Sequence, residues 1–174
     1  MAKHISHDRL LELVHYDPET GMMKWLKPTS NRVKIGQRAG SLAGRGYWQI
    51  KLDGVVYNFH RVAWFYVTGV WPDQWLDHKN GDGLDNRLSN LRLSTVSQNA
   101  GNAKRHSDNA VGFKGVERKR GKFASSIMCR GVKHRLGVFD TPELAHAAYV
   151  AASQKLFGEF ARAARPATCP TRST

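Results

Sequence analysis

The sequence predicts an α+β protein made of two small domains joined by a linker. In the first half, alternating strand-like residues and an Asp53-Gly54 turn precede a strongly apolar helical run. In the second half, three strand-like runs are followed by one helix. Between the halves hydrophobic periodicity is lost, and we place the linker at residues 103–112.

Composition and charge favour a folded, polyanion-binding protein. The 174 residues are 41% hydrophobic and 24% charged, which is typical of chains that bury a core. The chain has 27 Lys and Arg against 14 Asp and Glu, for a net charge of +13. Residues 101–174 carry +9 of this charge. A polyanion, and most naturally a nucleic acid, is therefore the expected partner, with a basic surface kept for solubility as the alternative.

Neither a membrane span nor a disulfide scaffold is expected. The longest apolar run, residues 62–67, is far shorter than the roughly 20 residues that a spanning helix needs. The first residues show no apolar signal-peptide core, and the chain has only two cysteines, Cys129 and Cys169. We therefore expect a cytoplasmic protein with reduced thiols and no structural zinc ribbon.

The elements of the first half follow from local patterns. A helix over residues 6–14 is capped by Ser6, and a short strand follows at 22–26. Residues 29–46 are expected to be loop and weak strand, followed by hairpin strands at 47–52 and 55–59. A core helix covers 60–67 and ends before Gly69. A polar loop between strand-like ends spans 76–95, and a helix follows to residue 102.

The second half predicts strands at 113–119, 122–129 and 132–139. Thr141 and Pro142 open a helix that runs to Gly158, with an expected buried face of Leu144, Ala148, Ala151, Ala152, Lys155 and Leu156. Residues 162–174 are expected to form a disordered tail.

The stretch from Asp77 to Asn99 contains the residue types that a phosphodiester nuclease needs. A neutral histidine such as His78 can accept a proton from water near physiological pH. Asp77 and Asn99 offer hard oxygen ligands for one magnesium or manganese ion. Adjacent strand residues point to opposite faces, so Asp77 and His78 can engage different targets only if the strand ends or kinks there, which the loop with Gly81 and Gly83 allows. The alternative is ordinary turn chemistry in a loop rich in Gly, Asn and Asp.

These residues resemble the HNH homing endonucleases of bacteriophages over roughly residues 8–102. The resemblance rests on residues 60–64, on Asp-His-Lys-Asn-Gly-Asp at 77–82, and on the blocks at 85–86, 88–92 and 97–99. It implies a ββα-metal fold in a nuclease domain of residues 1–102, with its motif core at 58–100. By this resemblance His78 is the general base, Asp77 and Asn99 are metal ligands, and Asn90 braces the loop and orients His78.

Three neighbouring residues have less specific roles. The family's last motif position is often His, and phage members also carry Asn, so we interpret Asn99 as a variant. Arg61 and Arg92 are candidate phosphate contacts, with plain surface charge as the alternative. His60 is expected to be structural, although the sequence leaves a catalytic role open.

The second half resembles the plant APETALA2/ethylene-response-factor DNA-binding domain over residues 113–161. The resemblance rests on residues 112–116, 121–124, 136–143, 145–149 and 157–161. It implies that the sheet enters the major groove through Lys114, Glu117, Lys119, Ser126, Met128, Lys133 and Arg135. Glu117 and Met128 stand where the plant domains have arginines, so a different base preference is expected. Phosphate contacts are expected from Arg118, Arg120, Lys122 and Arg130.

The sequence thus predicts a monomeric, metal-dependent DNA endonuclease of the homing type, acting in the host cytoplasm if the gene is a phage gene. No obligate protein partner is expected. The sequence leaves open the target site, nicking against double-strand cleavage, and the preferred metal. A DNA-binding regulator with a vestigial HNH fold is the alternative, and RNA binding lacks support because exposed stacking aromatics are few in residues 114–135.

Overall fold

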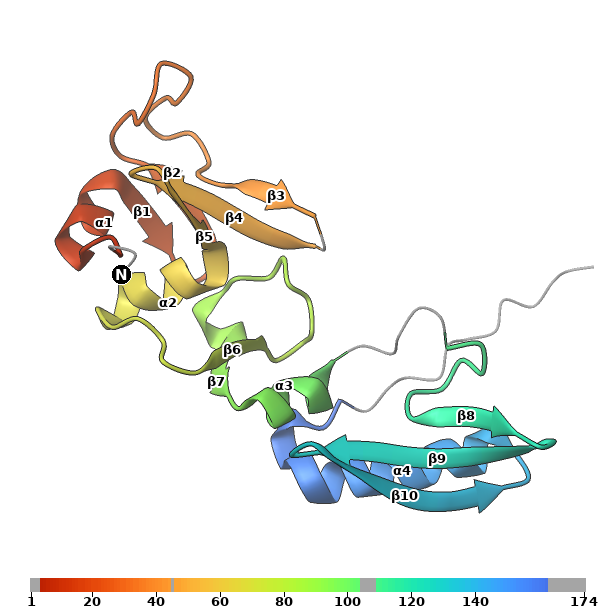
Figure 1. Cartoon of the computed structure of the whole chain (residues 1–174). Helices are drawn as coiled ribbons and strands as arrows, with labels where there is room; N and C mark the ends of the chain where they lie inside the picture. Colours follow the sequence, from red (N-terminus) through yellow and green to blue (C-terminus); the bar gives the residue numbers. More distant parts are fainter. Residues whose placement is uncertain (1–3, 45, 104–108, 163–174) are drawn as a thin grey trace, which may run out of the picture. The chain divides into compact units, whose positions relative to one another are not determined.

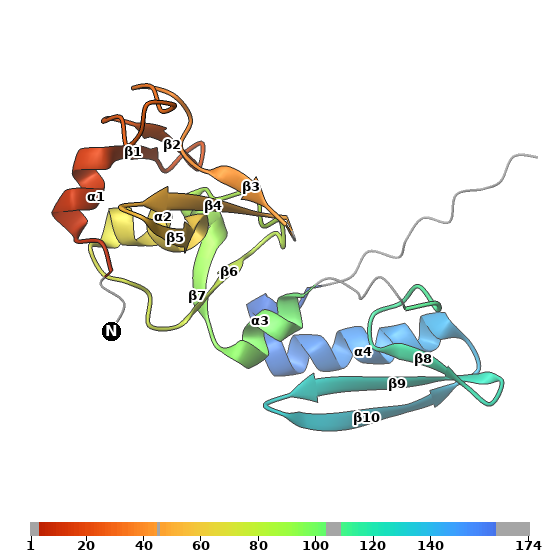
Figure 2. The ribbon, with the colours of Figure 1, turned by 45° about the horizontal axis from the view of Figure 1, so that its top comes forward.

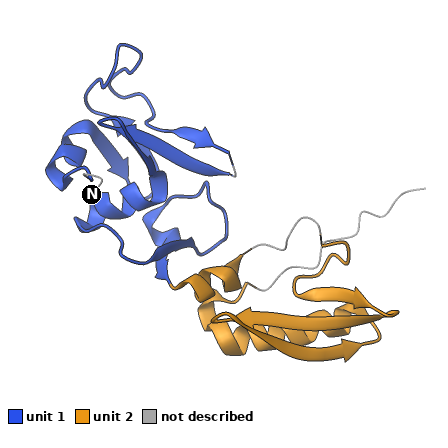
Figure 3. Cartoon of the chain, viewed as in Figure 1, with its two compact units in different colours: residues 1–94 blue, residues 95–174 orange. Residues whose placement is uncertain are grey.

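The computed structural model describes residues 4–44, 46–103 and 109–162. Two compact units make up the chain, unit 1 at residues 1–94 and unit 2 at residues 95–174 (Figure 3). None of the helices in the described part combines the length and apolar character that a membrane span requires. The predicted tail lies outside the described residues from 163 onward, as does the linker over 104–108.

Unit 1 begins with a short helix and a hairpin. Helix α1, His7–Leu13, starts as predicted at Ser6, whose hydroxyl accepts a hydrogen bond from the Arg9 backbone N–H. Strands β1, Val14–Asp17, and β2, Met22–Trp25, then pair antiparallel. Strand β1 was not predicted, because the apolar Val14 also continues the helical pattern before it. The turn between the strands is held by the Asp17 carboxylate, which accepts from the Glu19 backbone N–H.

The predicted hairpin and core helix of unit 1 are confirmed. Strands β3, Ser41–Ala43, β4, Tyr47–Leu52, and β5, Val55–Asn58, form one antiparallel sheet in the order β3-β4-β5. The β4–β5 turn uses left-handed backbone at Asp53 and Gly54. Helix α2, Phe59–Thr68, ends at Gly69, which is also left-handed.

The core of unit 1 lies between the two helices and the strands that they cover (Figures 1 and 2). Its most buried side chains come from α1, β1, β2, β4 and α2, so segments far apart in the sequence share one apolar interior. They are Leu10, Leu13, Val14, Tyr16, Met23, Ile50, Leu52, Val62 and Ala63.

A second small hairpin completes unit 1. Strand β6, Trp75–His78, pairs antiparallel with β7, Leu91–Ser94, and the turn η1, Leu88–Asn90, precedes β7. The loop of residues 79–87 joins the two strands and rests on the N-terminal hairpin. The Tyr16 hydroxyl donates to the Asn86 carbonyl at 2.7 Å, and the Leu88 N–H donates to the Pro18 carbonyl at 3.2 Å.

Unit 2 contains the predicted sheet and its helix. Strands β8, Val116–Lys119, β9, Lys122–Cys129, and β10, Val132–Phe139, form an antiparallel sheet in the order β10-β9-β8. Helix α4, Pro142–Phe157, lies against one face of the sheet, and the turn η2, Gly158–Phe160, follows (Figure 2). The Thr141 hydroxyl caps α4 by accepting from the Leu144 N–H.

The predicted buried face of α4 is correct only in part, since Ala148 and Ala152 are partly buried but the other four predicted residues are exposed. The helix buries Ala145, His146, Tyr149, Ser153 and Phe157. Leu144 is 56% exposed and Leu156 39% exposed, and Ala151 and Lys155 also face solvent. Alanines occur on several sides of this helix, so the spacing of hydrophobic residues does not identify its buried face. The aromatic rings decide instead, because Tyr149 lies directly over Gly115, where a side chain would overlap the ring.

Helix α3, Val96–Asn102, is the predicted helix with a Thr95–Gln98 capping box, and it belongs to unit 2. The Ser97 hydroxyl accepts from the Arg130 backbone N–H at 3.0 Å and lies 3.7 Å from the Cys129 sulfur. Gly101 lies against the Phe157 ring, with no room for a side chain. The compact units therefore divide between Ser94 and Thr95, whereas the sequence places the end of the first domain at residue 102.

Candidate functional site

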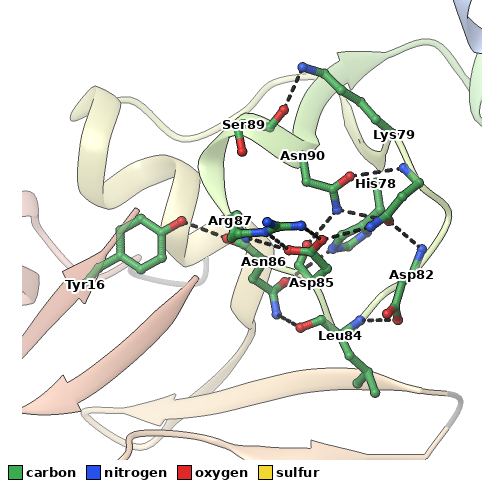
Figure 4. A network of polar contacts seen from close by, with 11 residues as sticks. Tyr16, His78, Lys79, Asp82, Leu84, Asp85, Asn86, Arg87, Ser89 and Asn90 are labelled. Carbon is green, nitrogen blue, oxygen red and sulfur yellow. Dashed lines mark hydrogen bonds and ion pairs between the residues drawn. The ribbon is translucent and has the colours of Figure 1, made fainter. Parts of the chain in front are cut away.

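His78 ends strand β6 and lies in a buried polar network (Figure 4). Its side chain is 5% exposed, and its Nε2 atom is 3.3 Å from the Asn86 Oδ1 atom. The Asn86 amide nitrogen donates to the Leu84 carbonyl at 3.2 Å. Burial lowers the pKa of His78, although Asn86 and nearby carboxylates act in the opposite direction. The ring is therefore held in the neutral form that a general base requires.

Two aromatic side chains from other elements surround this ring. His60, in the first turn of α2, contacts His78 edge to face, with ring centroids 5.2 Å apart. Tyr47, at the start of β4, is 5.9 Å from both histidines. Burial lowers the pKa of His60 to about 3, and the charges of His78 and Arg61 lower it further. Among the described residues, no group hydrogen-bonds the buried Nδ1 atom of His60.

Asp77 faces a different partner from His78, as the alternation of a strand predicts. It is paired across the hairpin with Arg92, whose Nε and Nη2 atoms both lie 2.9 Å from one carboxylate oxygen, Oδ2. Both side chains are largely buried, at 6% and 12% exposed. The structure thus gives Arg92 an internal partner where a phosphate contact was expected.

Arg61 also has internal partners. Its guanidinium donates to the Pro72 carbonyl at 2.6 Å and to the Gln74 carbonyl at 3.3 Å. These bonds fix the connection between α2 and β6. A phosphate contact by Arg61 or Arg92 stays a prediction that requires each guanidinium to serve two partners.

Asn90 braces the site loop but does not hold His78. Its amide nitrogen donates to Asn80 Oδ1 at 3.1 Å and to the Asp85 carbonyl at 2.8 Å. Its amide oxygen accepts from the Asn80 backbone N–H at 3.0 Å (Figure 4). Within the described part of the chain none of its hydrogen bonds reaches His78, so the expected bracing role has a structural basis and the orienting role does not.

Asn86 belongs to the site, although the sequence assigns it no role. It contacts the His78 ring, and only 2% of it is exposed. The signal was present, since Asp85-Asn86 is one of the blocks that carry the HNH resemblance, but no role was attached to it. Only the folded loop shows which of several asparagines reaches the ring.

The second expected metal ligand lies in the other compact unit. Asn99 is half-buried on α3 in unit 2, whereas Asp77 is in unit 1. Among the described residues, no cluster of three or more His, Cys, Asp or Glu side chains could hold a metal. The donor chemistry still fits magnesium, which prefers a few hard oxygen ligands and several waters. Arg92 already bonds the Oδ2 atom of the Asp77 carboxylate.

A buried neutral histidine next to a carboxylate is a site suited to general-base hydrolysis, and the comparisons with known proteins find a similarity in this part of the chain. Residues 57–101 match the family model described as HNH endonuclease, a segment that includes His60, Asp77, His78, Asn90 and Asn99. Over this segment the chain is similar to the HNH endonuclease family.

Two relatives from viruses extend this finding. The chain is 32% identical over 120 residues to a protein of Acanthamoeba polyphaga mimivirus described as an uncharacterized HNH endonuclease, covering 68% of this chain. It is 29% identical over 106 residues to Protein 3.8 of Escherichia phage T7, covering 59% of this chain and 87% of that protein. The chain spans 63% of the length of the mimivirus protein. No solved structure is significantly similar to the present chain.

In unit 2 the strand register gathers most of the predicted DNA contacts on one sheet face. Arg135 is paired with Ser126, Lys133 with Met128, and Lys119 with Lys122. Glu117 is paired with Ala124. Ala124 and Ser126 are two residues apart on β9, so their side chains point to the same face of the sheet, and Glu117 lies on that face too. Ser125 and Ile127 point to the opposite face, which is buried under α4.

The remaining predicted contacts lie elsewhere. Arg118 has the orientation of the α4 side, with its guanidinium 6.0 Å from the Phe123 ring centroid. Arg120 and Arg130 stand in the two sheet turns with left-handed backbone. Lys122 is the exception, because it lies on the outer face beside Lys119, where it forms an exposed ion pair with Asp140 at 2.8 Å that contributes little to stability.

Lys114 has a structural partner instead of an open position. Its ammonium donates to the Gly101 carbonyl at 2.7 Å and to the Ala103 carbonyl at 2.5 Å, which caps the C-terminus of α3. Burial lowers the pKa of Lys114 to about 8, and the charge of Arg162 lowers it further. A DNA contact by Lys114 would have to break this cap.

Proposed function

We propose that the protein is a metal-dependent endonuclease that hydrolyses phosphodiester bonds of double-stranded DNA. The observation that carries the proposal is the buried, neutral His78 beside Asp77, within the segment that matches the HNH endonuclease model. The similarity to the HNH endonuclease family supports nuclease chemistry on DNA. The homing role rests only on the sequence resemblance.

His78 accepts a proton from the attacking water, because burial keeps its imidazole neutral. Asp77 and Asn99 would hold one magnesium or manganese ion, which when bound neutralises charge on the scissile phosphate. Arg92 keeps the Asp77 carboxylate in a fixed orientation across the hairpin. Asn90 braces the loop that follows His78.

The outer face of the β8–β10 sheet is proposed to bind the target DNA, as in the APETALA2 type of domain. Support comes from the shared face of Lys119, Lys133 and Arg135 and from the basic charge of this half. Glu117 on the same face can accept from a cytosine amino group, and Met128 can contact a thymine methyl group. Glu117→Ala should therefore relax base preference at one position of the site.

The nuclease is tested by cleavage of supercoiled plasmid with and without magnesium or manganese. We expect nicked or linear product only with metal, and none with His78→Ala. The matched control is His15→Ala, an exposed histidine of β1 that lies outside the site. Cleavage that survives His78→Ala would show that another residue activates water.

The second candidate is a DNA-binding regulator that keeps the HNH fold without cutting. The observation that favours it is the ion pair between Asp77 and Arg92, because Asp77 is one of the two proposed metal ligands. The same experiment separates the two, because tight duplex binding without cleavage in either metal, on DNA that includes phage genome fragments, would support the regulator.

A further inference from the structure

We propose that Asn86 is the positioning residue for His78, fixing the neutral ring as the tautomer with its proton on Nε2, so that Nδ1 is the nitrogen that accepts the proton from water. The inference rests on the proposed nuclease function for its consequence. The tautomer itself is a property of the folded protein and can be measured without any cleavage.

The hydrogen bonds of the Asn86 amide determine its orientation. Its nitrogen donates to the Leu84 carbonyl at 3.2 Å, and a carbonyl oxygen can only accept. The opposite end of the amide, Oδ1, must then face the His78 Nε2 atom at 3.3 Å. An amide oxygen also only accepts, so the proton of this bond belongs to His78. In a neutral imidazole the other nitrogen, Nδ1, then carries the lone pair.

The surroundings of Asn86 fix the position of its backbone, from which the amide reaches the His78 ring. Its backbone carbonyl accepts from the Tyr16 hydroxyl at 2.7 Å, and Tyr16 is itself 2% exposed (Figure 4). Gly21 of the β1–β2 turn lies against the backbone of Asn86 and Arg87, with no room for a side chain. The β1–β2 hairpin thus fixes the backbone of Asn86, the residue that contacts the proposed base His78.

The neighbouring groups make the following contacts. His60 and Tyr47 approach the His78 ring as aromatic neighbours, with centroids more than 5 Å away. The hydrogen bonds of Asn90 go to Asn80 and Asp85 within the described chain. Asp77, next in sequence, is engaged by Arg92 on the paired strand.

The test is the ¹⁵N–¹H NMR spectrum of the His78 ring in the metal-free full-length protein, at about pH 8.5, where histidines are neutral. The His78 signals are assigned by their loss in His78→Gln. We expect one exchange-protected proton on Nε2 in the wild type. A proton on Nδ1 would overturn the proposal, and this result needs no variant to fold.

Three variants separate positioning from simple loop integrity. Asn86→Leu should remove the protected Nε2 proton signal, whereas Asn86→Asp, which keeps an acceptor, should retain it. Asn80→Ala is the matched control, because Asn80 braces the same loop without touching His78. A protected signal that is unchanged in Asn86→Leu, or equally lost in Asn80→Ala, would contradict the assignment.

Cleavage provides the second measurement. Asn86→Leu should lower the cleavage rate at saturating DNA by about 10- to 100-fold, part of what a general base contributes, with DNA affinity unchanged. Asn86→Asp should restore part of the rate. If the wild type shows the predicted tautomer but never cleaves, the nuclease proposal fails and the positioning of His78 stands.

Discussion

At the residue scale, His60 makes the stability of the protein depend on acidity. Its pKa is lowered to about 3 in the folded state by burial, from an ordinary value of 6.5. Between these values the unfolded chain binds a proton that the folded chain does not, so stability rises with pH. We expect a loss on the order of a few kcal/mol as the pH falls from 6.5 toward 3, with His78 acting in the same direction.

Urea unfolding at a series of pH values measures this effect. His60→Phe keeps an aromatic ring beside Tyr47 and His78 but cannot bind a proton. The variant should lose less stability than the wild type over this pH range. Equal losses in the two proteins would show that His60 does not stay neutral in the folded state.

The residues of the site differ in how far the sequence could predict them. Asp77 and His78 could be selected from the sequence because they are adjacent residues of one contiguous motif. Arg92 and Asn86 were not, because their partners lie across a hairpin and around a loop. A charged or amide side chain has several possible partners, and tertiary contacts select one. These contacts also give Lys114, Arg61 and Arg92 internal partners that charge alone does not indicate.

At the scale of elements, the N-terminal hairpin supports the site loop through Gly21. This glycine has a left-handed backbone and lies against the backbone of Asn86 and Arg87. We expect Gly21→Ala to destabilise the protein by about 1–3 kcal/mol, through strain at a special backbone conformation and overpacking. The variant should also disturb the His78 ring signals.

Thermal unfolding and the NMR spectrum of His78 check this prediction. The control is Gly54→Ala, because Gly54 has a similarly positive φ and no heavy atom near the added methyl group. It should cost stability but leave the His78 signals in place. Unchanged His78 signals in Gly21→Ala would mean that the hairpin does not support the site.

Lys114 has a comparable role for helix α3. Lys114→Met removes the donor for the carbonyls of Gly101 and Ala103, and should destabilise unit 2 by about 1–3 kcal/mol. Lys133→Met changes the same charge on the exposed sheet face and should shift stability by less than about 0.5 kcal/mol. Chemical denaturation of both variants tests the contrast, and a larger effect at Lys133 would contradict it.

Elements with their own start and stop signals were predicted closely. Asp53-Gly54 and Thr141-Pro142 identify the β4–β5 hairpin and the start of α4, and strands β9 and β10 have the predicted bounds. Strand β1 was missed because a strand that follows a helix without a turn residue has no local boundary signal. The buried face of α4 was predicted only in part because aromatic contacts with the sheet, not helix periodicity, select it.

At the scale of the whole molecule, the charge of +13 predicts salt-sensitive DNA binding. Each lost phosphate contact should reduce the slope of log affinity against log salt by about 0.9. We expect Arg135→Ala on the sheet face to lower affinity and reduce this slope. Lys155→Ala makes the same charge change at an exposed position of α4 and should leave the slope nearly unchanged.

Fluorescence anisotropy with a labelled duplex over a range of salt concentrations measures both variants. Equal slopes for Arg135→Ala and Lys155→Ala would mean that the affinity for DNA depends on the total charge of the protein and not on this face of the sheet. In that case the APETALA2-like proposal would lose its main structural support.

The packing of helix α3 has a consequence for how such genes recombine. The helix is tied to Cys129, Arg130 and Phe157 of unit 2, although the HNH match extends over it to residue 101. An exchange of C-terminal units that crosses over between Ser94 and Thr95 keeps these contacts, whereas one at residue 102 breaks them. Under the proposed function, Asn99 is then inherited with unit 2 and not with His78, so an active chimera would have to combine the proposed base and a proposed metal ligand from different parents.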